Sequence, residues 1–188
     1  MKIFLVGICC VGKTTIGREL ARTQGYRFYD LDKEIESYFK KSISQIQSMF
    51  IGDYSYRNYV AIVLRRIINE NKNSKYIVAL PPSGLRDCFL REIKKEEDRV
   101  IIAIHDRPEN ILKRLCFYDD SSNKIEKTLT EKEKKRCLRE LRLDNTYFNR
   151  TYKRANYHVD IDGLSINESV EKIEELIRGI EKNDLIQK

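Results

Sequence analysis

The stretch KIFLVGICCVGKTTIGREL, from Lys2 to Leu20, decides the fold class of this 188-residue chain. Its first part, Lys2–Val6, is a mainly apolar run that suits a buried parallel strand. A G-x-x-x-x-G-K-T motif follows from Gly7 to Thr14, and a helical pattern begins there. Strand, loop and helix in this order predict a phosphate-binding loop, because the backbone N–H groups at the start of such a helix attract an anion.

Each position of the loop has a predicted task. Lys13 supplies positive charge for the outer phosphates of a nucleoside triphosphate, and the Thr14 hydroxyl is placed to bind Mg²⁺. Cys9 and Cys10 occupy variable positions where the backbone N–H matters, although a positive φ at Cys10 would cost roughly 1 kcal/mol. We predict that the loop binds ATP through Gly7, Cys10, Val11, Gly12, Lys13, Thr14 and Thr15.

Strand-like and helix-like segments alternate along the rest of the chain, which predicts an α/β fold with a parallel sheet flanked by helices. The predicted strands are 2–6, 27–29, 76–80, 100–104 and 157–160. The predicted helices are 14–23, a short one that begins with a Ser42-x-x-Gln45 capping pattern, 54–69, 109–115, a long one capped by Thr130-x-x-Glu133 that reaches about residue 147, and 166–180.

The composition is that of a globular chain, with 41% hydrophobic and 35% charged residues. The net charge is +7, but basic and acidic residues mix in stretches such as EIKKEEDR (92–99) and TEKEKKR (130–136). This mixing is typical of solvated helix faces and argues against a nucleic-acid surface. The positive surplus instead suits an anionic small-molecule substrate.

Nothing in the sequence predicts a membrane or secreted protein. No apolar run approaches the roughly 20 residues of a membrane-spanning helix, and KIFLV is too short for a signal-peptide core. Five cysteines without a C-x-x-C spacing favour free thiols over a zinc site. We therefore expect one cytoplasmic domain over residues 1–188, acting as a monomer, with no nucleic-acid or membrane partner.

The sequence YDLDKEIE places Asp30 and Asp32 at the end of the second predicted strand. Parallel sheets bind ligands at such strand ends, and side chains two residues apart in an extended segment point the same way. Asp30 is then suited to hold a water bound to Mg²⁺, and Asp32 to accept or orient the hydroxyl proton of an acceptor. The alternative is that Asp32 only caps the following helix.

Several motifs of the chain resemble those of a known family. The opening stretch, the segment FYDLDKEIE, and SISQI followed by GDYSYR resemble the corresponding motifs of shikimate kinase, with one residue inserted near Phe50–Ile51. The resemblance implies a five-stranded parallel sheet, a helical substrate-binding segment at 33–71 and a mobile lid at 117–129. It implies that Asp32 contacts the acceptor hydroxyls and that Arg57 binds the acceptor carboxylate, for which the planar guanidinium is suited.

The same resemblance implies the reaction. ATP, with Mg²⁺ as the cofactor, phosphorylates shikimate to 3-phosphoshikimate in the biosynthesis of aromatic amino acids. Lys13 and Asp32 are the predicted catalytic residues. The resemblance implies that Thr14 binds Mg²⁺, and Asp30 at the strand end completes the predicted metal site.

The acceptor half departs from the family pattern. The family has a Gly-Gly-Gly turn where VALPPSG places Pro81 and Pro82, which have no N–H, so that Ser83 and Gly84 are the remaining backbone donors. The glutamate that the family carries three residues after the arginine is replaced by Val60.

Two further departures concern arginines. The R-P-L-L segment of the family's lid is absent, and CFYDDSSNKIEKTL stands in its place, with Lys124 or Lys127 as the candidate phosphate contact. The second carboxylate-binding arginine of the family falls on Tyr147, and Arg150 is the nearest substitute. Arg107-Pro108 lies before a helix and is not assigned to the lid.

Three hypotheses follow. The chain is a shikimate kinase with a remodelled pocket, a kinase of another small hydroxylated acid, or a nucleotide-binding regulator without catalysis. Loss of one charge-assisted contact costs about 2–5 kcal/mol, which is enough to change the preferred acceptor. Retention of Lys13, Thr14, Asp30 and Asp32 together disfavours the regulator.

The loop thiols carry one more expectation. Cys9 and Cys10 lie near Lys13 and the positive end of a helix dipole, and both features lower a thiol pKa. We expect one of them to be alkylated faster than Cys88, Cys116 and Cys137, and to be protected by ATP. The alternative is that both thiols are packed away.

Overall fold

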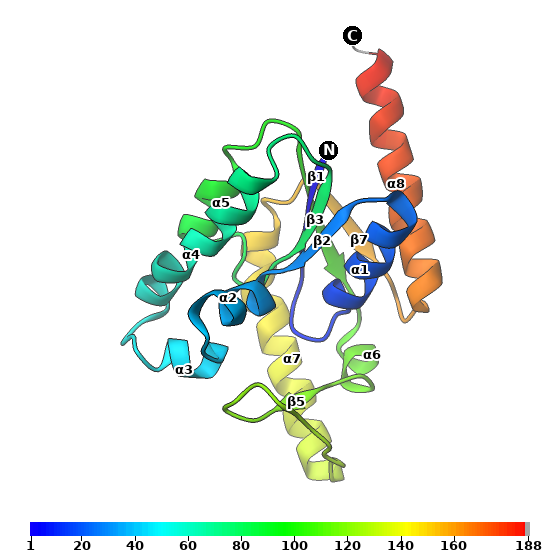
Figure 1. The fold of residues 1–188 in the computed structure, drawn as a ribbon. Helices are drawn as coiled ribbons and strands as arrows, with labels where there is room; N and C mark the ends of the chain where they lie inside the picture. Colours follow the sequence, from blue (N-terminus) through cyan, green and yellow to red (C-terminus); the bar gives the residue numbers. More distant parts are fainter. Residues whose placement is uncertain (187–188) are drawn as a thin grey trace.

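The computed structural model describes residues 1–186. Its centre is a five-stranded parallel sheet in the order β2-β3-β1-β4-β7, which confirms the predicted fold class (Figure 1). The strands are β1 (Lys2–Val6), β2 (Arg27–Asp30), β3 (Tyr76–Ala79), β4 (Arg99–His105) and β7 (Tyr157–Asp160). Every residue of β1 and β3 is buried, because both strands have neighbours on either side and helices on both faces.

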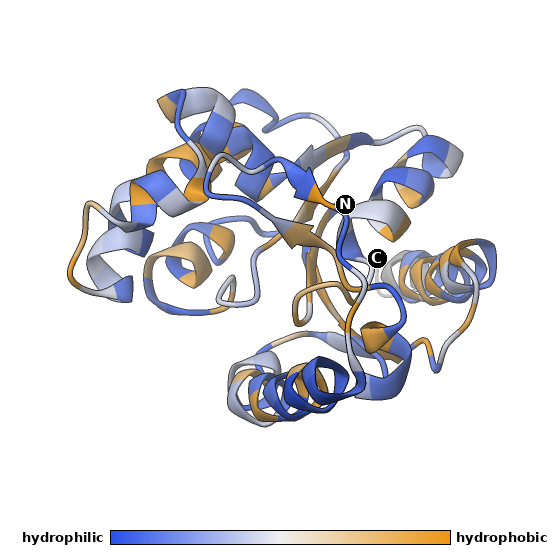
Figure 2. Cartoon of the chain, turned by 90° about the horizontal axis from the view of Figure 1, so that it is seen from below, coloured by the Kyte–Doolittle hydropathy of each residue, from blue (hydrophilic) through white to orange (hydrophobic). Residues whose placement is uncertain are grey.

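Eight helices surround the sheet within the described residues. They are α1 (Lys13–Gln24), α2 (Leu31–Phe39), α3 (Ile43–Gln47), α4 (Asp53–Glu70), α5 (Asp87–Ile93), α6 (Pro108–Leu112), α7 (Glu131–Tyr152) and α8 (Ile166–Ile186). Helix α1 packs against α8 on one side of the sheet, and α4 packs against α5 on the other (Figure 1). Figure 2 shows the apolar residues gathered on the strands and on the inward faces of the helices.

The carboxyl ends of the strands lie at the lower end of the molecule in Figure 1. The loop after β1, helices α2, α3 and α6, and a small hairpin gather there. The hairpin consists of β5 (Phe117–Tyr118) and β6 (Lys124–Ile125), which pair antiparallel. Its turn is closed by the Asp119 carboxylate, which accepts the backbone N–H groups of Ser121 at 2.9 Å and Asn123 at 2.8 Å.

All five predicted strands and all six predicted helices are present, but α2, α5 and the hairpin were not predicted. Helix α2 was missed because it starts without a loop: Asp30 is both the last residue of β2 and the N-cap of α2, where its side chain accepts the Lys33 N–H. The capping boxes predicted at Ser42 and Thr130 are confirmed.

The stretch 92–99 differs from the expected solvated face. Glu92 and Glu96 are buried, and each is paired with a basic residue from another part of the chain. Arg65 contacts Glu92 at 2.9 Å, and Lys2 pairs with Glu96. The buried carboxylates are therefore compensated by ion pairs that the local sequence does not reveal. Within residues 1–186, every helix is too short or too polar to cross a membrane.

Candidate active site

The loop between β1 and α1 has the backbone geometry of an anion cradle. Gly12 is the N-cap of α1 with φ 108°, a conformation that glycine adopts readily because it has no Cβ. A Cβ at Gly7 would lie 2.6 Å from the Ile104 carbonyl oxygen, so this position also needs glycine. Cys10 has φ 58°, as considered from the sequence, and this strain costs roughly 1 kcal/mol. The surrounding structure holds this non-glycine residue in an unfavourable conformation.

Lys13 folds back over the loop. Its Nζ donates to the carbonyl oxygens of Gly7 at 2.8 Å and Ile8 at 2.9 Å. Burial lowers the pKa of the Lys13 ammonium, and the nearby Asp32 carboxylate works in the opposite direction. Neutral carbonyls are weaker partners for an ammonium than phosphate oxygens, so the Lys13 ammonium can exchange these bonds for bonds to an anion.

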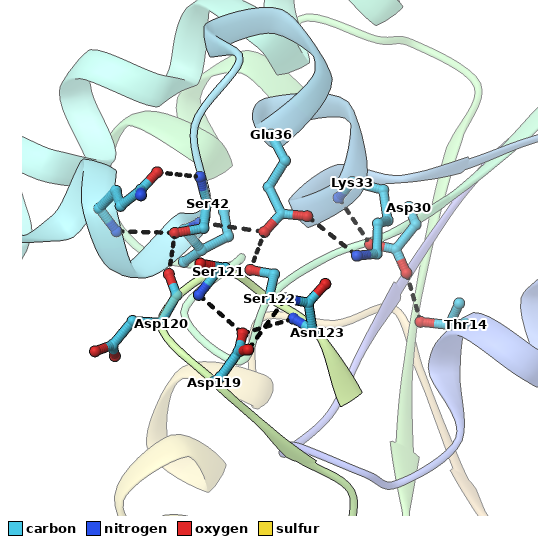
Figure 3. A network of polar contacts seen from close by, with 12 residues as sticks. Thr14, Asp30, Lys33, Glu36, Ser42, Asp119, Asp120, Ser121, Ser122 and Asn123 are labelled. Carbon is cyan, nitrogen blue, oxygen red and sulfur yellow. Dashed lines mark hydrogen bonds and ion pairs between the residues drawn. The ribbon is translucent and has the colours of Figure 1, made fainter. Parts of the chain in front are cut away.

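Thr14 and Asp30 are brought together from two elements. The Thr14 Oγ1 at the start of α1 donates to the Asp30 Oδ2 at the end of β2 at 2.6 Å (Figure 3). Mg²⁺ prefers oxygen ligands and is commonly bound by one or two protein groups together with substrate phosphates. A hydroxyl and a carboxylate beside a phosphate loop fit that pattern, and the described residues contain no group of three metal-ligating side chains that would fit another metal.

Asp32 lies in the first turn of α2, two residues after the strand end. The expectation that Asp30 and Asp32 share one extended segment was therefore wrong, and the N-cap is Asp30 and not Asp32. The two carboxylates are nevertheless close enough to interact. Burial, and then the charge of Asp30, raise the pKa of Asp32 to about 6, against an opposing effect of Lys13.

Arg114 is a site residue that sequence reasoning missed. Its Nε donates to the Cys10 carbonyl at 2.9 Å and its Nη2 to the Val11 carbonyl at 3.2 Å. The same Nη2 pairs with Asp106, which is buried at the end of β4. Although burial opposes it, hydrogen bonds from Asn110 and Arg114 lower the pKa of Asp106, which therefore stays charged. Arg114 thus braces the phosphate loop from outside.

The hairpin reaches across to α2 and α3. Ser122 donates to the Glu36 carboxylate, and Ser42 donates to the Asp120 carbonyl at 2.5 Å (Figure 3). A cavity of about 370 Å³ lies between the hairpin and these helices. These contacts join the segment predicted as a lid (117–129) to the segment predicted to bind the acceptor (33–71).

The two lysines considered for phosphate contact differ. Lys127 forms an ion pair with Glu133 at 2.9 Å and lies over the Phe117 ring, so its charge is already balanced. Lys124 is exposed in β6. Arg107, which was not assigned to the lid, pairs with Asp162 at 2.5 Å.

Arg57 is buried in the first turns of α4 and is held by two carboxylates. Its Nη2 and Nε lie 2.9 and 3.2 Å from Asp87 Oδ2, and its Nη1 lies 3.4 Å from Asp53. Val60, at the family's glutamate position, is fully buried in the core. Asp87, from the start of α5, is the nearer of the two carboxylates that pair with Arg57. Asp87 has φ 45°, a strained conformation.

The loop after β3 is tightly folded. The Gly84 N–H donates to the Pro81 carbonyl at 2.8 Å, so the backbone donor predicted at Gly84 is occupied within the turn. A Cβ at Gly84 would lie 2.5 Å from the Leu80 Cβ, which explains the glycine by packing. Ser83 is half-buried at the tip. Helix α7 holds the loop, because the Tyr152 hydroxyl donates to the Pro82 carbonyl at 3.1 Å.

Arg150 lies exposed in the last turn of α7. Tyr147, one turn earlier, contacts Arg86 from the loop after β3: the Arg86 Nη1 lies 2.5 Å from the Tyr147 hydroxyl, and its guanidinium lies 5.0 Å from the centre of the ring. The structure therefore brings Tyr147 together with an arginine that the sequence did not single out.

The loop thiols differ from the expectation. Cys9 has exposed surface, but desolvation of its thiol raises the pKa, and the charge of Lys13 only partly opposes this. The predicted lowering of the Cys9 pKa was therefore wrong, because a helix terminus and one ammonium do not outweigh the desolvation. All five cysteines are free, and Cys88 and Cys137 are buried.

Comparison with known proteins agrees with this arrangement. The family model described as shikimate kinase matches residues 9–178. A shikimate kinase of Chlorobium phaeobacteroides is 31% identical over 191 residues, covering 96% of this chain and 90% of that protein. One of Thermoanaerobacter pseudethanolicus is 28% identical over 188 residues, covering 91% of this chain and 92% of that protein.

Solved structures share the fold. The shikimate kinase of Bacteroides thetaiotaomicron has a TM-score of 0.76 at 21% identity, covering 95% of this chain and 98% of that one. The shikimate kinase of Acinetobacter baumannii in complex with shikimate has a TM-score of 0.69 at 23% identity, covering 95% and 93%. With its phosphate loop, its paired carboxylates and a family match over most of its length, the chain belongs to the shikimate kinase family of ATP-dependent kinases.

Proposed function

We propose that this chain transfers the γ-phosphoryl group of ATP to a hydroxyl of shikimate, giving ADP and 3-phosphoshikimate. The observation that carries the proposal is the junction of the phosphate loop with the end of β2, where Thr14 contacts Asp30 at 2.6 Å and Asp32 lies within the field of Lys13. At this junction the Lys13 ammonium, which can bind phosphate, lies near the Asp32 carboxylate, which can bind an acceptor hydroxyl. Membership of the shikimate kinase family supports the choice of acceptor.

The residues divide the work of an in-line transfer. The acceptor oxygen forms a bond to the γ-phosphorus while the bond to the β–γ bridging oxygen of ATP breaks. Asp32 orients the acceptor hydroxyl and takes its proton, and the Lys13 ammonium turns from the loop carbonyls to the phosphoryl oxygens. Thr14 and Asp30 would hold Mg²⁺, which neutralises charge on the phosphates. The N–H groups from Gly7 to Thr15 cradle the phosphates, and the lid at 117–129 excludes water.

The acceptor side is assigned to Asp32, Arg57, Ser83 and the loop that ends at Gly84. Arg57 lies next to this loop, because its partner Asp87 is three residues beyond Gly84. The partners are ATP and a small anionic metabolite, and we infer a monomer that acts in the cytoplasm. Five free thiols support a reducing compartment.

The direct test is an assay of ADP release with ATP, Mg²⁺ and shikimate. We expect release that depends on shikimate, formation of 3-phosphoshikimate by mass spectrometry, and loss of both in Lys13→Ala. A well-folded wild-type chain that binds ATP but never phosphorylates shikimate would contradict the proposal.

A second candidate is a kinase of another small hydroxylated acid. Pro81, Pro82 and Tyr147 favour it, because they stand at acceptor-site positions where the family has glycines and an arginine. A panel of hydroxylated carboxylic acids in the same assay distinguishes the two: a kcat/KM higher for another acid than for shikimate would select the second candidate.

A further inference from the structure

We propose that Arg86 binds the carboxylate of the acceptor, in place of the second arginine that the family carries at the position of Tyr147. This inference rests on the proposed function and names the residue that selects an acidic acceptor. It replaces Arg150, the nearest arginine along the sequence, with an arginine from another element.

Arg86 lies in the right position for this role. The Tyr147 hydroxyl and the Arg86 Nη1 are 2.5 Å apart, and the Arg86 guanidinium lies over the Tyr147 ring at 5.0 Å. A tyrosine side chain and an extended arginine side chain reach similar distances from the backbone. The guanidinium of Arg86 therefore lies close to the place that a guanidinium attached at residue 147 would reach. The guanidinium at this place is therefore carried by the loop after β3 and not by α7.

Arg57 and Arg86 differ in how their charges are balanced. Arg57 is paired with both Asp87 and Asp53, so two carboxylates already offset its charge. Among the described residues, Arg86 has no carboxylate within ion-pair distance, and its partner is a neutral phenol. A half-buried guanidinium with a neutral aromatic partner keeps its full charge for an incoming anion. Arg57 stabilises the structure of the site, and Arg86 supplies the positive charge that attracts the acceptor carboxylate.

The backbone that carries Arg86 is held in place. Arg154 of the segment after α7 donates to the Leu85 carbonyl at 2.9 Å, and the Arg86 N–H donates to the Ser83 carbonyl at 2.9 Å. On the other side, Arg57 grips Asp87, the residue directly after Arg86. The backbone on both sides of Arg86 is thus anchored, so binding an anion does not require the loop to be ordered first.

The experiment compares an acid with its uncharged ester. Wild type, Arg86→Met, Arg86→Lys and Tyr147→Phe are assayed with shikimate and with its methyl ester. In Arg86→Met we expect the KM for shikimate to rise by roughly 30-fold or more, with the KM for ATP unchanged. The preference for acid over ester should fall by a similar factor. Arg86→Lys should recover part of it, since a point charge replaces the planar fork.

Arg91→Met is the matched control, because Arg91 is an exposed arginine in α5 with no ion pair or hydrogen bond among the described residues. It removes the same charge and should keep the wild-type preference. An unchanged preference in Arg86→Met, or a loss that appears instead in Arg150→Met, would overturn the assignment. If wild type phosphorylates a different hydroxy acid, the proposed function fails, and the same acid and ester comparison on that acceptor still decides the role of Arg86.

Discussion

The nucleotide half and the acceptor half of this chain are built in different ways. The nucleotide half is continuous in sequence: β1, the phosphate loop and the start of α1 supply the anion cradle within residues 2–15, and only Asp30 and Arg114 come from elsewhere. The acceptor half gathers residues from α2, α4, the loop after β3 and α7. A site made from one continuous segment is recognisable by its sequence motif. In a site made from four segments, a charged side chain can come from a different helix or loop.

We infer two exchanges of this kind. Asp87 of α5 pairs with Arg57 in addition to Asp53 of α4, and position 60, where the family has a glutamate, is the buried Val60. The guanidinium beside Tyr147 comes from Arg86 and not from α7. Arg86 and Asp87 are neighbours, at the N-cap and the first residue of α5. We therefore expect the contrast between the halves to appear in the effects of substitutions.

The largest effect is expected in the nucleotide half. Lys13→Ala should lower kcat by at least about 10³-fold, since it removes the one ammonium over the loop that can neutralise the developing charge. Its thermal unfolding should stay close to that of wild type, because the side chain bonds only to loop carbonyls. Lys72→Ala, at an exposed lysine, is the control. Wild-type turnover in a folded Lys13→Ala would remove the basis of the kinase mechanism.

Asp32→Asn should lower kcat by about 10²-fold, near the low end for a general base because phosphoryl transfer has a loose transition state. The KM for ATP should change little. The kcat/KM of wild type for the acceptor should fall as the pH is lowered through about 6, where Asp32 takes up a proton. If the profile stays flat between pH 7 and 5, Asp32 is not the group that meets the hydroxyl.

The same variant should be more stable than wild type at pH 7. The folded pKa of Asp32 is raised to about 6, above its value in the unfolded chain, so the folded state binds more protons and wild type loses stability as the pH rises from 4 to 6. Removing this charge should therefore increase the free energy of unfolding at neutral pH, on the order of 2 kcal/mol. Urea unfolding at pH 7 and pH 4.5 measures it, with Glu97→Gln as the surface control. A gain equal at both pH values would contradict this explanation.

In the acceptor half, Arg57→Met should cost stability on the order of 2 kcal/mol, less than the 3–5 kcal/mol of a fully buried pair, because Asp87 and Asp53 are 38% and 85% exposed. Arg86→Met should unfold like wild type within about 0.5 kcal/mol, since its partner is a surface tyrosine. Denaturant unfolding of the two variants separates a structural arginine from one that serves binding. Equal losses would mean that both arginines are structural.

The smallest effect concerns the loop thiols. With its pKa raised, Cys9 should react with iodoacetamide several-fold more slowly at pH 7 than an unhindered thiol, and its rate should increase up to a higher pH. Mapping of the labelled peptides by mass spectrometry, with and without MgATP, measures this rate. Labelling of Cys9 faster than that of free cysteine at pH 7 would restore the original expectation of an activated thiol.

The contrast also explains what the sequence could predict. The strands and the phosphate loop follow from local patterns, because an apolar run and a G-x-x-x-x-G-K-T motif specify their own backbone. The Thr14 and Asp30 contact was anticipated because strand ends in a parallel sheet share one edge. Helix α2 was missed because Asp30 ends a strand and caps a helix at once.

The roles of three residues could not be predicted from the sequence for a different reason: Arg114, Asp87 and Arg86. Each acts on a residue that is distant in sequence: Arg114 on Cys10, Asp87 on Arg57, and Arg86 on Tyr147. Long-range ion pairs and stacking contacts leave no periodic signal in a single sequence. The prolines at 81 and 82 marked the loop as altered, but not which side chain compensates. The raised pKa of Cys9 likewise depends on what surrounds the loop.

The most direct test of the central claim is a crystal structure of the chain with shikimate, ADP and Mg²⁺. We predict that the ADP phosphates accept hydrogen bonds from the N–H groups of the loop, that a shikimate hydroxyl lies at Asp32, and that the shikimate carboxylate lies within hydrogen-bond distance of the Arg86 guanidinium. A carboxylate bound by Arg57 and Arg150, with Arg86 still stacked on Tyr147 and away from the ligand, would contradict the claim that the acceptor carboxylate is bound from the loop after β3.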